Sequence, residues 1–121
     1  MATLTEPTTF SDWLVMEGGK RYSRDDVTLL AGKKYVSGEV LGIVTATFKY
    51  TSYNQDGTDG TENAVGVLME DVDATDSDMP GVAIVRHAQV LKKNLTWPDD
   101  IDPGEKDSAL GYMKYIGILG V

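Results

Sequence analysis

Few residues of this 121-residue chain have the types and spacing that active sites use. His87 is the single histidine, which excludes a metal site with two histidine ligands. One histidine beside a carboxylate is enough for acid–base catalysis, but His87 is expected mid-strand beside Arg86, where a structural role is favoured. Ser11, Ser23 and Ser37 lack the Gly-x-Ser-x-Gly setting of a serine nucleophile. No catalytic residue is therefore predicted.

Two acidic loops are the remaining candidates for chemistry. A calcium loop counted from Asn54 requires Gly at the sixth place and Glu at the twelfth, whereas the chain has Asp59 and Val65 there. In the second loop, residues 74–81, Asp76 and Asp78 are interpreted as solvated charges. The chain has no Cys, which removes thiolate and disulfide chemistry, and no Gly-rich phosphate motif occurs. The sequence predicts no cofactor and no metal.

Net charge and the length of the apolar runs exclude two classes of partner. The net charge is −8, and no Lys or Arg occurs between Lys49 and Arg86. Such a chain repels the phosphate backbone of nucleic acids. No apolar run approaches the ~18–20 residues of a membrane helix, and the amino terminus lacks the pattern of a secretory signal. We expect no nucleic-acid partner, no membrane partner and synthesis in a cytoplasm.

The apolar run at residues 64–69 is the element around which the chain is organised. It lies between two polar loops and has no polar alternation, which is typical of a strand buried on both faces. Further strands are expected at residues 12–17, from Val40 onward after a tight turn at Ser37-Gly38, at residues 82–88 and 90–91, and at residues 116–121 as an addition to a sheet. Gly42 within a strand indicates a bulge or the close approach of another backbone.

One helix is expected, over residues 103–114. Asp102 and Glu105 have the spacing of a capping box, with Pro103 at the first helical position. Apolar residues then recur at helical spacing, at Ala109, Tyr112, Met113 and Ile116. The expected fold is mainly β: a small β-rich single domain with one short C-terminal helix.

The amino-terminal residues 1–11 differ in composition from the rest. They are rich in Thr, contain Pro7 and have little to bury, so a mobile arm is expected. Phe10 and Trp13 form an aromatic pair at the root of this arm. The pair either anchors the arm to its own domain or is held for a partner, and both alternatives remain open.

Several motifs occur together in a characteristic order. They are Ser-Arg-Asp-Asp-Val-Thr-Leu at residues 23–29, Ser-Gly-Glu-Val-Leu-Gly-Ile-Val-Thr at 37–45, Asp-Gly-Thr at 59–61, Ala-Val-Gly-Val-Leu at 64–68, Val-Arg at 85–86 and Leu-Thr-Trp-Pro at 95–98. This ordered series resembles the head-decoration proteins of tailed phages, the family of the lambda capsid-stabilising protein D. The resemblance runs from about Tyr22 to the carboxyl end. The motifs at 23–25 and 37–42 resemble family members other than the lambda protein, which lacks this longer form.

The resemblance implies a β-tulip-like decoration domain at residues 22–121, preceded by a flexible capsid-binding arm at residues 1–21. It implies a homotrimer that binds the major capsid protein at three-fold sites of the expanded head and stabilises the head against internal DNA pressure. Its location would be the outer capsid surface of the virion, after assembly in the host cytoplasm. The candidate capsid contacts are Thr3, Leu4, Thr5, Phe10 and Trp13. The candidate trimer contacts, Leu95, Trp97 and Ile118, fit a monomer core equally well.

Two other functional classes are alternatives to a non-enzymatic cementing protein. Residues 36–42 are similar to biotinyl- or lipoyl-type carrier barrels, and Met113-Lys114 is similar to part of their attachment site. There the lysine belongs on a hairpin turn, whereas Lys114 lies in a predicted helix. A small trimeric hydrolase with sites between subunits would use His87 and the Asp76/Asp78 loop. Paired carboxylates of the glycosidase type stay open, because any acidic chain offers candidates. Nothing in the sequence identifies an enzyme.

Overall fold

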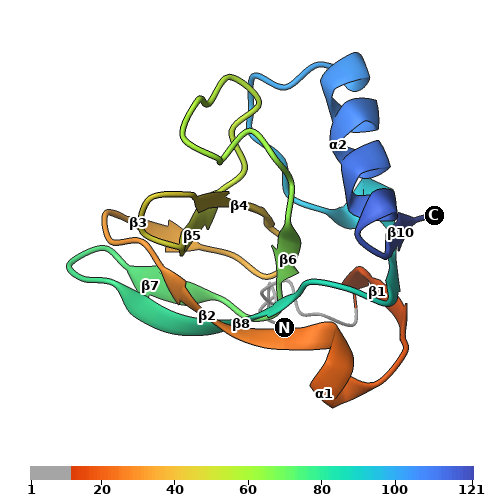
Figure 1. Ribbon diagram of the computed structural model, residues 1–121, viewed down its shortest axis with the longest axis horizontal. Helices are drawn as coiled ribbons and strands as arrows, with labels where there is room; N and C mark the ends of the chain where they lie inside the picture. Colours follow the sequence, from red (N-terminus) through yellow and green to blue (C-terminus); the bar gives the residue numbers. More distant parts are fainter. Residues whose placement is uncertain (1–11) are drawn as a thin grey trace, which may run out of the picture.

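Five strands close into a barrel in the computed structural model, which describes residues 12–121 (Figure 1). The barrel strands are β2 (Arg24–Leu29), β4 (Val40–Val44), β5 (Lys49–Ser52), β6 (Gly66–Leu68) and β8 (Met79–Ile84), in the order β2-β5-β4-β6-β8. β2 and β8 pair antiparallel along their whole length, and β2 meets β5 in parallel at Leu29 and Tyr50. The predicted class is confirmed, since the protein is mainly β, with 39% strand and 18% helix.

Two smaller sheets and three helical segments complete the fold. β1 (Leu14–Glu17), β9 (Ala88–Val90) and β10 (Ile118–Gly120) form a sheet in which β1 is antiparallel and β10 parallel to β9. β3 (Lys33–Tyr35) pairs with β7 (Val72–Ala74). The helical segments are α1 (Lys20–Ser23), a 3-10 turn at Lys92–Asn94 and α2 (Pro103–Tyr115). No described helix has the length and apolar character of a membrane span.

The predicted central strand is confirmed as β6. All three of its residues are buried, and its successive side chains serve two different cores. Val67 packs with Trp13, Met113 and Ile118 in a cluster between the barrel and the β1-β9-β10 sheet. Leu68 belongs to a second cluster with barrel residues such as Leu29 and Leu41. Since side chains alternate across a strand, a strand between two cores needs apolar residues at every position.

Gly42 marks a close contact between two backbones, as its place in a strand predicted. A Cβ atom added at Gly42 would lie 2.6 Å from the carbonyl oxygen of Thr61 and 2.7 Å from its Cα. Thr61 belongs to the loop before β6, and the Asn54 amide donates to its carbonyl (2.9 Å). The missing side chain therefore lets the acidic loop at residues 54–63 lie directly against β4.

The helix is confirmed together with its capping box. The Glu105 amide donates to the Asp102 carboxylate (2.8 Å), and the Asp102 amide donates to the Glu105 carboxylate (3.1 Å). Ala109 and Met113 face the core. α2 stands to one side of the barrel and leads into β10, which confirms that the apolar end of the chain is a strand added to a sheet (Figure 1).

Replacing Asp102 by alanine is expected to lower the free energy of unfolding by about 1 kcal/mol, because one capping hydrogen bond to the helix terminus is lost. Chemical denaturation followed by circular dichroism measures the change. Asp100→Ala is the matched control, since Asp100 is an exposed aspartate in the preceding turn. Equal losses in the two variants would show that the effect comes from charge and not from capping.

Three sequence expectations need correction. β8 begins at Met79 and includes Pro80 and Gly81, which the sequence placed in a loop. Pro80 has no amide hydrogen to donate to a neighbouring strand. It is tolerated because β6 pairs with β8 only at Ala83 and Ile84, so no strand on that side of Pro80 needs such a donor. His87 is not mid-strand but occupies a turn between β8 and β9 with φ 52°. α1 and the 3-10 turn were missed, since segments of 4 and 3 residues carry no periodicity.

Candidate interaction surfaces

Trp13 lies near the amino terminus and is held in place by several contacts with the domain. It is fully buried, and its indole Nε1 donates to the Ser37 hydroxyl (3.0 Å). That hydroxyl donates in turn to the carbonyl of Met69 (2.7 Å). A side chain at Gly38 would collide with the indole, its Cβ lying 2.9 Å from Trp13 Cδ1. The Ser37-Gly38 turn predicted from the sequence therefore forms the binding site of the Trp13 indole.

Backbone contacts hold the same stretch against the domain. The Leu91 amide donates to the Trp13 carbonyl (2.7 Å), and the Asn94 side-chain amide donates to the Asp12 carbonyl (2.7 Å). β1 then pairs with β9. Residues 12–17 are therefore held by the folded domain, and the division of the chain after residue 21 stays a prediction. Thr3, Leu4, Thr5 and Phe10 lie outside the described residues.

Of the two alternatives for the aromatic pair, the structure assigns self-anchoring to Trp13. Its indole has no exposed surface, so a capsid contact by Trp13 stays a prediction that requires the indole to leave this site. Leaving it is costly, because the large apolar side chain has both a core to fill and a buried hydrogen-bond partner. Trp13 fixes where the amino-terminal segment leaves the domain.

The three candidate trimer residues occupy different environments. Ile118 is fully buried and Leu95 is 7% exposed, both in the core cluster that contains Trp13. For these two the structure gives the alternative that the sequence left open, a place in the monomer core. Trp97 is half-buried at the edge of that cluster, and its ring meets the Tyr53 ring edge-on at 6.1 Å.

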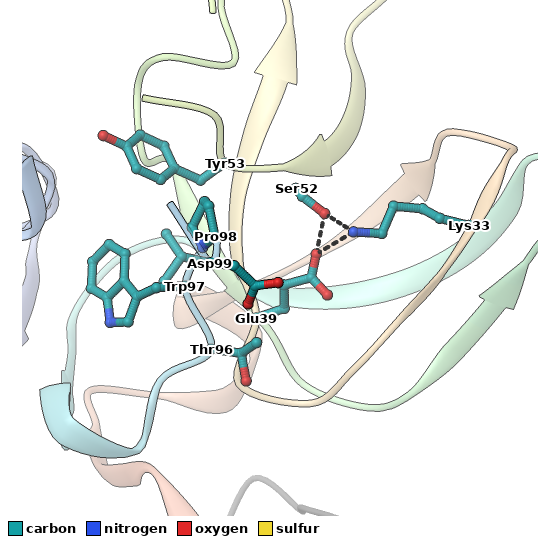
Figure 2. Close-up of a pocket in the computed structure, with 9 residues that line it drawn as sticks. Lys33, Glu39, Ser52, Tyr53, Thr96, Trp97, Pro98 and Asp99 are labelled. Atoms are coloured by element: carbon teal, nitrogen blue, oxygen red, sulfur yellow. Dashed lines mark hydrogen bonds and ion pairs between the residues drawn. The ribbon is translucent and has the colours of Figure 1, made fainter. Parts of the chain in front are cut away.

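Trp97 and Tyr53 line one wall of a pocket of about 270 Å³, shown in Figure 2. The opposite wall carries a polar network in which the Lys33 ammonium contacts the Glu39 carboxylate (3.2 Å), and Ser52 bonds to both. The Val36 amide also donates to Glu39 (3.2 Å). The network ties β3 and β5 to Glu39, the residue just before β4, and its groups are satisfied by one another. It is a structural tie and not an arrangement that activates a nucleophile.

The hydrolase candidates do not converge within the chain. Asp76 and Asp78 precede β8, whereas His87 follows it, and a strand of 6 residues spans roughly 20 Å. Asp78 pairs with Lys49 (2.5 Å) and accepts from the Ala31 amide (2.7 Å), and these bonds hold the pKa of its carboxyl below the ordinary value. His87 packs edge-on against the Tyr22 ring at 4.6 Å. Each group has a structural partner of its own.

The metal and carrier hypotheses gain no support from the geometry. Among residues 12–121, no three acidic or histidine side chains gather in a way that could hold a metal ion. Lys114 lies in the last turn of α2, as predicted, and not on the hairpin turn that a carrier attachment site requires. Within the described part of the chain, the Lys33–Glu39–Ser52 network is structural.

Sequence reasoning missed an exposed apolar surface on the β1-β9-β10 sheet. We name it the outer face and define it by Val15, Met16, Leu119 and Val121, whose exposed fractions are 49%, 56%, 37% and 47%. The alternation of buried and exposed positions within the short strands was the available signal. It stayed hidden because the register between β1, β9 and β10 cannot be read from one sequence.

Comparison with known proteins gives a family match. Residues 3–118 match the family model described as bacteriophage lambda head decoration protein D. No curated protein matches the chain. The match extends further toward the amino terminus than the motif series that began near Tyr22, and it includes most of the first eleven residues. Head decoration is a structural role on the capsid of a phage particle. The chain belongs to the family of the bacteriophage lambda head decoration protein D.

Proposed function

We propose that the protein binds as a homotrimer to three-fold sites of the expanded phage head and stabilises the head against the pressure of packaged DNA. The observation that carries the proposal is the family match over residues 3–118, which covers the amino-terminal segment as well as the domain. The role is mechanical and needs no catalysis. It agrees with the satisfied polar networks described above.

The amino-terminal segment is the proposed capsid-binding element, with Thr3, Leu4, Thr5 and Phe10 as its contacts. An extended segment can add a strand to an exposed sheet edge of the major capsid protein through backbone hydrogen bonds. Burial of Trp13 supports this assignment, because a fixed starting point lowers the entropy that the segment loses on binding. The proposed arm is residues 1–21, and within it residues 12–17 also contact the domain.

Trimerisation would strengthen binding without stronger single contacts. Three segments on one body bind with avidity, because the second and third contacts are intramolecular. A ligand that binds only the intact expanded lattice stabilises that lattice by mass action. The half-buried Trp97 is the proposed trimer contact with the most exposed surface, while Leu95 and Ile118 stay predicted contacts that lie in the monomer core. The net charge of −8 disfavours contact with the genome.

Deletion of residues 2–9 is expected to weaken binding to expanded empty shells at least about tenfold, or ~1.4 kcal/mol per site. Cosedimentation of protein with shells measures the affinity. The matched control replaces the same residues with a Gly/Ser segment of equal length, which keeps the chain length but removes the side chains. Both variants are expected to bind weakly. Undiminished binding of the deletion variant would remove the segment from the mechanism.

Sedimentation of the same preparations tests the assembly. Full-length and deletion variants are both expected to sediment as trimers at micromolar concentration, so that lost binding cannot be ascribed to lost assembly. A species of 13.1 kDa alone would contradict the trimer. Thermal rupture of filled particles with and without added protein tests stabilisation, and decorated particles are expected to rupture at the higher temperature.

A further inference from the structure

The outer face of the β1-β9-β10 sheet is an ordered apolar surface. The register places Met16 opposite Gln89, and Leu119 also opposite Gln89, so these three side chains form one row across the sheet. The neighbouring row points the other way into the core, with Ala88 and Ile118 buried. Val121 continues the outer face two residues beyond Leu119, by strand alternation. The row contains no charged residue, although the chain has 25% charged residues.

A bulge in β1 enlarges this surface. The register shifts between Leu14 and Met16, and as a result the consecutive residues Val15 and Met16 are both exposed. A regular strand would have turned one of them inward, whereas a bulge changes the direction of a side chain. Exposed apolar side chains grouped on one sheet, here with the uncharged Gln89 between them, mark interaction sites more often than a scattered single one does. The inner side is already covered, since Met113 of α2 packs in one cluster with Ile118.

We propose that the outer face docks on an apolar, uncharged surface of the major capsid protein, directly beside the site that takes the amino-terminal segment. This inference rests on the proposed function and adds a second contact to it. The position of the chain start carries the argument. The first eleven residues precede Asp12, whose carbonyl is held by Asn94, and β1 begins two residues later. Val15 lies four residue steps after residue 11, roughly 13 Å of extended chain.

The short stretch of chain between Phe10 and Val15 determines which partner the outer face meets. A partner that holds Phe10 is necessarily within about 20 Å of the outer face, given an extended chain of ~3.3 Å per residue. Trp13 prevents this stretch from lengthening, because it is buried and its carbonyl accepts from Leu91. The face and the segment therefore reach the same partner. The absence of charge in the row agrees with an apolar contact and not with electrostatic steering by the acidic domain.

The double variant Met16→Gln/Leu119→Gln tests the proposal in the full chain. Both positions are exposed, so the fold should be retained. Binding to expanded empty shells is expected to weaken at least about tenfold, with the thermal midpoint and the trimer unchanged. The matched control is Phe48→Gln/Met79→Gln, which removes two exposed apolar side chains, 73% and 38% exposed, from loops and strand ends of the barrel. The control is expected to bind like the parent protein.

Three outcomes overturn the inference, and they are distinguishable. Parent-like binding by the Met16/Leu119 variant overturns the docking face but leaves the segment mechanism intact. Dissociation of that variant into monomers shows that the face is a seam between copies. Failure of the parent protein to bind shells refutes the proposed function itself.

A readout on the unmodified protein completes the test. Met16 is expected to be oxidised by dilute peroxide in the free protein and protected on shells, as measured by peptide mass. Met79 is expected to stay reactive in both states. Protection of Met16 before shells are added would also indicate a seam between copies.

Discussion

Replacing Trp13 by alanine is expected to lower the free energy of unfolding by about 3–5 kcal/mol, the usual range for loss of a buried tryptophan. The indole is fully buried in the cluster that joins the barrel to the β1-β9-β10 sheet. Its removal leaves a cavity against Gly38 and deprives the Ser37 hydroxyl of a donor. A loss of this size is a large part of the stability of a domain of 121 residues.

Urea denaturation followed by circular dichroism measures the effect. Trp97→Ala is the matched control, because Trp97 is only half-buried, and a clearly smaller loss is expected. Trp13→Phe keeps most of the apolar volume but not the hydrogen bond to Ser37, so an intermediate value is expected. If Trp13→Ala and Trp97→Ala lost equal stability, the anchoring role of Trp13 would be refuted.

The Gly42→Ala variant is expected to lose about 1–3 kcal/mol, as overpacking of a tight core usually costs. The added Cβ would lie 2.6 Å from the Thr61 carbonyl oxygen and 2.7 Å from its Cα. Both atoms belong to the backbone and cannot rotate away like a side-chain end. Either β4 or the loop at residues 54–63 must move. Since β4 pairs with both β5 and β6, the displacement is expected to reach the barrel.

The control for Gly42 is another glycine in the same chain. A Cβ at Gly111, on the exposed side of α2, meets nothing within 4 Å. Gly111→Ala is expected to stabilise the protein by about 0.5–1 kcal/mol, because alanine favours a helix over glycine. The two Gly→Ala variants are therefore expected to change the stability in opposite directions. The unfolding midpoint of each variant, compared with that of the parent protein, measures the change. A destabilised Gly111→Ala together with an unchanged Gly42→Ala would contradict the interpretation.

Local signals were enough to predict most elements. The uninterrupted apolar run predicted β6 because it is too short for a free-standing helix and has turn-forming residues on both sides, although periodicity alone does not distinguish it from a buried helical turn. Asp102 and Glu105 predicted the start of α2, since a capping box is completed within four residues and needs no distant partner. Gly42 predicted either a bulge or a close backbone approach, the usual reasons for a glycine in a strand, and the structure has the close approach. The ordered motifs likewise predicted the family that the match over residues 3–118 shows.

Tertiary structure decided which surface each apolar side chain faces. Trp13, Leu95 and Ile118 are core residues, and no pattern in the sequence separated them from residues held for a partner. Burial depends on which distant segment packs against a residue, such as Ser37-Gly38 against Trp13. The same holds for the outer face, where the register of β9 against two strands from opposite ends of the chain places Met16 and Leu119 in one row. The sequence shows that an apolar side chain lowers the free energy when it is buried. The chain topology determines whether its own domain or a partner buries it.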